Sequence, residues 1–134
     1  MNYTEWMEDG KRDIVRRALK EVAMTGLRAP HHFYITFRTQ FPGVQIAQEL
    51  HKSYPDEMTV MLNDAFSALG IQDDYFMVDL IFDHQKSTLR IPFKSLVSFM
   101  DPGVEFALQF DWETNVPAPS LSNVIFIDQF RHNV

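Results

Sequence analysis

The stretch Phe76-Met77-Val78-Asp79-Leu80-Ile81-Phe82 indicates the fold more clearly than any other part of this 134-residue chain. Its apolar side chains recur at every second position, which is the period of a β-strand with one buried face. The same alternation predicts strands over residues 33–38, 58–63, 88–93 and 104–110, and Val97 and Phe99 mark a sixth. Turn residues such as Pro42-Gly43 separate the runs, so antiparallel strands are expected.

A helix is predicted before the strands. Apolar residues recur there at helical spacing, at Ile14, Val15, Ala18, Leu19 and Val22. Gly26 and Pro30 are typical of the end of a helix. One helix followed by five or six short strands predicts an α+β fold, mainly β, with a strongly bent sheet or partly open barrel. We expect a helix in residues 1–29, a barrel in 30–111, and a linker with a tail in 112–134.

The composition is that of one globular domain, with 46% hydrophobic and 22% charged residues. The net charge is −6, and between residues 30 and 110 ten acidic residues face only five basic ones. This body lacks the basic surface that binds phosphate backbones, so nucleic-acid binding is not expected. No membrane span or signal peptide is predicted, and the lack of Cys fits a reducing cytoplasm.

Residues for catalysis or metal binding do not form a recognisable pattern. The five His residues are scattered without ligand spacing, so no metal site is expected. The chain has no G-x-S-x-G elbow, and its five Gly residues are isolated, so no phosphate-binding loop is predicted. An enzyme is therefore disfavoured, although an unrecognised small enzyme stays open, and no cofactor is expected.

The second face of the predicted strands is unusually apolar. It carries Tyr34, Met61, Met77 and Ile81 between polar residues. Such a face either packs against another part of the same chain or binds a partner, and flexible Met side chains suit a partner. Periodicity alone leaves both interpretations open.

Three stretches in this order carry a family resemblance: Phe41-Pro42-Gly43-Val44-Gln45-Ile46, Tyr54-Pro55-Asp56-Glu57-Met58-Thr59-Val60, and Asp101-Pro102-Gly103-Val104-Glu105-Phe106-Ala107-Leu108-Gln109-Phe110. Together they resemble the stringent starvation protein B (SspB) family in its alphaproteobacterial-like form. Members of that family are adaptors that hand tagged proteins to the ClpXP protease. The resemblance implies a Sm-like barrel, no enzymatic activity, and a cytoplasmic location.

The resemblance also implies a peptide site and a dimer. A groove on the barrel would receive an ssrA-type degradation tag, and the matching positions are Asn63, Asp64, Ala65, Phe66, Met77, Asp79, Leu80, Ile81 and Phe82. The leading helix would form the contact of a homodimer through Ile14, Val15, Ala18, Leu19 and Val22. The same stripe is also suited to packing on the barrel.

The tail follows a linker rich in Pro and Ser, which runs from Trp112 to Asn123. The hydrophobic segment Val124–Arg131 is either a last strand of the body or a short motif for another protein. The resemblance implies docking on the N-terminal zinc-binding domain of ClpX, through Ile125, Ile127, Phe130 and Arg131. An RNA-binding Sm-like module is the alternative function, and the acidic body argues against it.

Overall fold

The computed structural model describes residues 1–63, 68–82 and 84–112. The elements in chain order are α1 (Tyr3–Thr25), β1 (Phe33–Arg38), α2 (Gln48–Ser53), β2 (Glu57–Leu62), β3 (Ala68–Ile71), β4 (Tyr75–Phe82), β5 (Gln85–Pro92), the 3-10 turn η1 (Phe93–Ser95), β6 (Leu96–Asp101), the 3-10 turn η2 (Pro102–Val104) and β7 (Phe106–Gln109). A helix followed by antiparallel strands confirms the predicted α+β class, mainly β.

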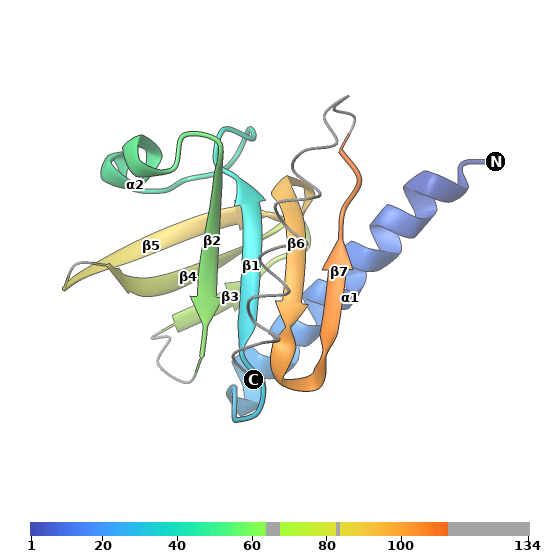
Figure 1. Ribbon diagram of the computed structural model, residues 1–134, viewed down its shortest axis with the longest axis horizontal. Coiled ribbons are helices and arrows are strands. Elements are labelled where there is room, and N and C mark those ends of the chain that lie inside the picture. Colours follow the sequence, from blue (N-terminus) through green and yellow to red (C-terminus); the bar gives the residue numbers. More distant parts are fainter. Residues whose placement is uncertain (64–67, 83, 113–134) are drawn as a thin grey trace.

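The strands form two antiparallel sheets, in the orders β2-β1-β6-β7 and β3-β4-β5. In Figure 1 the four-stranded sheet faces the viewer, and the three-stranded sheet and α1 lie behind it. A single bridge between Gln45 and Arg90 extends from the edge of β5. The two sheets are bent around one core, and they are not closed into a barrel.

The predicted alternation places the core correctly along four strands. Phe33, Ile35 and Phe37 of β1 are buried, and the alternate residues of β2, β4 and β5 join them in one cluster. The largest side chains that are fully buried are Phe37, Phe76, Phe93 and Phe99. Burial of such aromatic side chains removes a large apolar area from water, which is the main stabilising term for a domain of this size.

Helix α1 packs on this core with its apolar stripe. Val15 and Leu19 are completely buried and Val22 is nearly so, whereas Ile14 is 44% exposed. Three of the five residues predicted for a dimer contact therefore belong to the chain's own core. Packing of an amphipathic helix stabilises it by burying one stripe, and here the sheets already cover that stripe.

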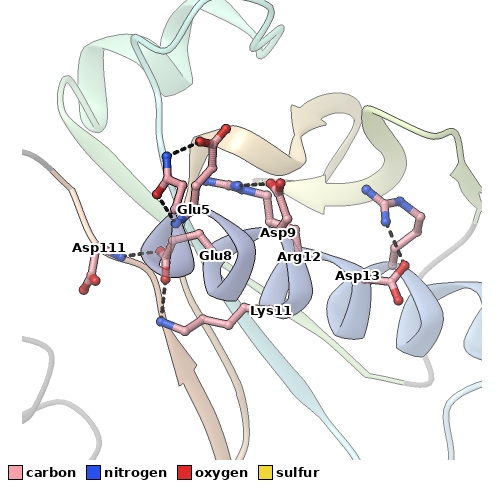
Figure 2. A network of polar contacts seen from close by, with 9 residues as sticks. Glu5, Glu8, Asp9, Lys11, Arg12, Asp13 and Asp111 are labelled. Carbon is pink, nitrogen blue, oxygen red and sulfur yellow. Dashed lines mark hydrogen bonds and ion pairs between the residues drawn. The ribbon is translucent and has the colours of Figure 1, made fainter.

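Helix α1 begins at Tyr3 and passes through Gly10 without interruption. The side chain of Asn2 accepts a hydrogen bond from the backbone N–H of Glu5 at 3.1 Å, which is the usual cap of a helix N-terminus. Glu8 accepts a hydrogen bond from the backbone N–H of Asp111 at 2.7 Å and pairs with Lys11 (Figure 2). Lys11 also donates to the carbonyl of Gln109 at 2.7 Å. These contacts attach the first turns of α1 to the end of the sheet.

Three details differ from the prediction. Helix α2 and strand β3 were not predicted. The strand predicted over 104–110 is shorter, because the chain turns at Pro102–Val104 and Glu105 adopts a left-handed conformation with φ 56°. This turn leaves Val104 and Phe106 exposed instead of placing them in the core.

Candidate functional site

The outer face of the three-stranded sheet brings together residues from all three of its strands. Met77, Asp79 and Ile81 of β4 lie on one side of that strand because alternate residues share a face. Their cross-strand partners are Gly70 and Ala68 of β3 and Arg90, Thr88 and Lys86 of β5. These eight residues are called the β4 face below.

The β4 face is apolar along its centre and open above β3. Ile81 is 68% exposed and Met77 is 37% exposed, which is unusual for large apolar side chains of a central strand. A Cβ atom on Gly70 would meet nothing within 4 Å, so the space above the backbone of Gly70, beside Met77, is open. Within the described residues β3 pairs with β4 alone. Such a surface can accept an extended chain, because an edge strand offers backbone groups and its neighbour offers side-chain contacts.

A charged group interrupts the apolar centre. The hydroxyl of Thr88 donates to Asp79 Oδ1 at 2.6 Å, and Lys86 Nζ lies 3.4 Å from Asp79 Oδ2. The hydrogen bond from Thr88, followed by Lys86, lowers the pKa of Asp79 below its ordinary value. Asp79 therefore remains ionised at neutral pH, with Lys86 as a neighbouring cation.

Arg90 adds an aromatic neighbour to the same face. Its guanidinium lies over the ring of Tyr75, with Cζ at 3.9 Å from the ring centroid. This cation–π contact places the guanidinium against Tyr75, and Met77 is the cross-strand partner of Arg90. The β4 face thus combines two apolar side chains with fixed charges of both signs.

The predicted peptide residues divide into four groups. Met77, Asp79 and Ile81 share the β4 face. Leu80 points to the opposite side of the strand and packs against the core, so a ligand on the β4 face does not reach it. Asn63 follows β2 and is partly buried. Asp64, Ala65, Phe66 and the side chain of Phe82 lie outside the described residues, as do all four predicted tail residues.

Sequence reasoning missed the residues that β3 and β5 contribute. Thr88 and Lys86 were not proposed as site residues, although they determine the electrostatics around Asp79. The signal that could have found them is the hairpin between β4 and β5. Counting outward from its turn pairs Asp79 with Thr88 and Ile81 with Lys86.

A hollow lies between α1 and the end of the four-stranded sheet, apart from the β4 face. It has a volume of about 780 Å³ and is largely apolar, with Ile14, Ala18 and Val22 on the helix and Phe33, Phe99 and Phe106 on the strands. His31 Nδ1 contacts the buried carboxylate of Asp101 at 2.7 Å at its rim. Ile14 and Ala18, the two stripe residues that are not fully buried, both face this hollow.

In residues 1–63, 68–82 and 84–112 no group of three or more His, Asp or Glu side chains is placed to hold a metal ion. No helix in that part of the chain is long and apolar enough to cross a membrane.

The fold and the β4 face together define a small α+β domain with an exposed sheet surface that suits an extended ligand. A family model described as stringent starvation protein B matches residues 5–123, and the chain belongs to this family. The match confirms the resemblance and extends it to α1 and to the linker. A comparison with curated proteins finds no match.

Replacing Thr88 by Val is expected to raise the pKa of Asp79 toward its ordinary value, because the substitution removes the hydroxyl donor and keeps the side-chain shape. A lowered pKa in the folded state stabilises the fold above the unfolded pKa, and this stabilisation is lost as pH falls through the folded pKa. The variant should therefore be slightly less stable at neutral pH, and the difference from the unaltered chain should vanish as pH falls below the folded pKa of Asp79. An NMR titration of the Asp79 carboxyl carbon measures the shift.

Ser87→Ala is the matched control, since Ser87 lies on the other side of β5, opposite Leu80. It should leave the titration of Asp79 unchanged. If Thr88→Val also left the titration unchanged, Thr88 would not determine the ionisation of Asp79.

Proposed function

We propose that this chain is a non-enzymatic proteolysis adaptor of the cytoplasm, which binds ssrA-type degradation tags and delivers tagged proteins to ClpXP. Membership in the stringent starvation protein B family supports an adaptor role. The observation that carries the peptide-binding part is the exposed apolar centre of the β4 face, with Ile81 68% exposed on an ordered strand.

The β4 face suits a tag peptide in extended form. Ile81 and Met77 would contact apolar side chains of the tag, and the open surface at Gly70 would let the peptide backbone approach the sheet. Asp79 and Lys86 would select the charge pattern of the tag, since burying an unmatched charge weakens binding. Asn63, Asp64, Ala65, Phe66 and Phe82 stay in the proposal as further contacts.

The tail supplies the second contact of the proposed adaptor. Ile125, Ile127, Phe130 and Arg131 would dock on the N-terminal zinc-binding domain of ClpX. The family match ends at residue 123, so this role is supported by the sequence of the tail alone. Joining two modest contacts by a short linker raises the effective concentration of substrate at the protease to about the millimolar range.

The dimer contact is proposed on the part of α1 that the core leaves free. Ile14 and Ala18 beside the 780 Å³ hollow would meet a second copy, while Leu19 and Val15 hold the helix to its own sheets. Sedimentation velocity of the whole chain tests this proposal, and a protein that stays monomeric at tens of micromolar would exclude it.

Reconstituted degradation of a tagged substrate tests the adaptor role. The chain should accelerate ClpXP at substrate concentrations well below saturation, where the gain in effective concentration matters, and have little effect at saturation. The double variant Ile125→Asp, Ile127→Asp should lose this acceleration and keep its affinity for the tag. Asn133→Asp adds charge to the tail outside the proposed motif and should behave as the unaltered chain. A double variant that still accelerated degradation would exclude the docking role of the tail.

A further inference from the structure

Arg90 brings to the β4 face a positive charge that no carboxylate in the described part of the chain balances. The other cation of this face, Lys86, lies 3.4 Å from Asp79 Oδ2. Arg90 makes no such ion pair with the described residues, and its Nε has no hydrogen-bond partner among them. With two cations and one carboxylate, the β4 face has a net positive charge on a chain whose net charge is −6.

Both the backbone and the side chain of Arg90 are held in place. Its N–H donates to the carbonyl of Gln45 at 2.9 Å, and its carbonyl accepts from the N–H of Gln45 at 3.0 Å. The guanidinium stacks on Tyr75, with Cζ at 3.9 Å from the ring centroid, and the ring accounts for the burial of Nε. Stacking uses the flat side of a guanidinium and leaves its terminal N–H groups able to donate two parallel hydrogen bonds to one anion.

The charges around Arg90 favour a carboxylate over a phosphate as that anion. A guanidinium binds both groups in a bidentate manner. Asp79 lies on the same face, two positions along β4 from the cross-strand partner of Arg90, and it is ionised at neutral pH. Repulsion from Asp79 and from the acidic body grows with the negative charge of the ligand, so a group with a single negative charge is preferred.

Arg90 and the exposed apolar side chain of Ile81 lie at a fixed separation on the β4 face. Ile81 is four residues along β4 from Met77, and Met77 pairs with Arg90. At about 3.3 Å per residue this separation is about 13 Å along the strand, which about four residues of an extended peptide span. A peptide that contacts both residues therefore has its carboxylate about four residues away from its apolar side chain.

We propose that Arg90 is a specificity-determining residue, which receives a carboxylate of the bound peptide. The carboxylate comes from an acidic side chain or from the C-terminus of the peptide. This inference rests on the proposed function, because it takes the β4 face as the peptide site. The ligand class is an extended peptide with an apolar side chain on Ile81 and a carboxylate about four residues away on Arg90. Asp79 adds to the selection by repelling a carboxylate that lies closer to the apolar centre.

Fluorescence anisotropy with the full chain and a labelled ssrA-type tag peptide, at one fixed ionic strength, tests the role of Arg90. Arg90→Gln removes the charge and should weaken peptide binding at least 10-fold, since the carboxylate would lose its bidentate partner. Lys20→Gln is the matched control, because it removes the same charge from an exposed residue of α1 outside the β4 face. Its Kd should stay within about twofold of the unaltered chain.

Variants of the peptide identify the carboxylate. In one set each acidic side chain is replaced in turn by its amide, and in one further peptide the C-terminus is amidated. One of these peptides should bind the unaltered chain about as weakly as the original peptide binds Arg90→Gln. Combining that peptide with Arg90→Gln should cause little further loss, because the two changes remove the same interaction. The peptide that behaves in this way shows whether a side chain or the terminus is the source.

An exchange of charges separates recognition from an effect on the fold. Arg90→Glu should bind a peptide with Lys at the identified position at least 10-fold more tightly than the original peptide. The unaltered chain should have the opposite preference. A variant that had merely lost its packing on Tyr75 could not gain affinity for the altered peptide. Circular dichroism checks that each variant is folded, and Arg90→Met replaces Arg90→Gln if the latter is not.

Two results would overturn the inference. Equal weakening by Arg90→Gln and Lys20→Gln would assign the effect to the overall charge of the protein. Losses that simply add for every altered peptide would show that Arg90 contacts none of the carboxylates. An unaltered chain that bound no tag peptide would contradict the proposed function as well, whereas tag binding with either of the first two results contradicts this inference alone.

Discussion

Replacing Leu19 by Glu is expected to destabilise the fold strongly. Leu19 is completely buried among the side chains of the core, where α1 packs on the sheets. The substitution removes this apolar packing and introduces a carboxylate without a partner. We expect a loss of about 3–5 kcal/mol in the free energy of unfolding. Urea denaturation followed by circular dichroism measures the loss.

Met24→Glu is the matched control, because it places the same charge on the same helix at a side chain that is 84% exposed. Its effect should stay within about 0.5 kcal/mol. The Leu19→Glu protein could instead keep the denaturation midpoint of the unaltered chain and differ only in being monomeric. That result would show that Leu19 belongs to the dimer contact implied by the family resemblance.

Replacing Ile81 by Asp should abolish most of the binding of an ssrA-type tag peptide. The side chain of Ile81 is 68% exposed, so the substitution should leave the fold intact. It would place a second carboxylate on the face that already holds Asp79, in the middle of the proposed apolar contact. We expect a loss on the order of 2 kcal/mol, which is about a 30-fold weaker Kd. Fluorescence anisotropy with a labelled peptide measures it.

Met61→Asp controls for the added charge, since Met61 is 46% exposed on the outer face of the other sheet. The tag affinity of this variant should be unchanged. Equal weakening by both variants would point to a general effect of charge, and no weakening by Ile81→Asp would remove the β4 face from the peptide site.

Much of the fold could be predicted, because the core strands alternate strictly. The period of two along β1, β2 and β4 marks the side chains that join the core cluster, and the structure agrees. Strand β3 escaped notice because four residues, one of them Gly70, offer almost no alternation. Helix α2 spans only six residues and has no side-chain cap, so neither its period nor its start is visible in the sequence.

The site was less predictable than the core. Alternation alone places Met77, Asp79 and Ile81 on one face, but the contributions of Thr88 and Lys86 depend on strand register. Leu80 was included by local similarity, against the alternation that turns it toward the core. The stripe of α1 shows the same limit. A helical period identifies an apolar face, but it does not tell whether the chain itself or a second copy covers Leu19.

The central claim is that the β4 face binds the tag, and methyl NMR of the full chain with an ssrA-type peptide tests it most directly. Titration should shift the methyl signals of Met77 and Ile81 in a saturable manner, with little change at Met61, which lies on the other sheet. Saturable binding that shifted Met61, or the side chains around the hollow beside Ile14, and left Met77 and Ile81 unchanged would contradict the account.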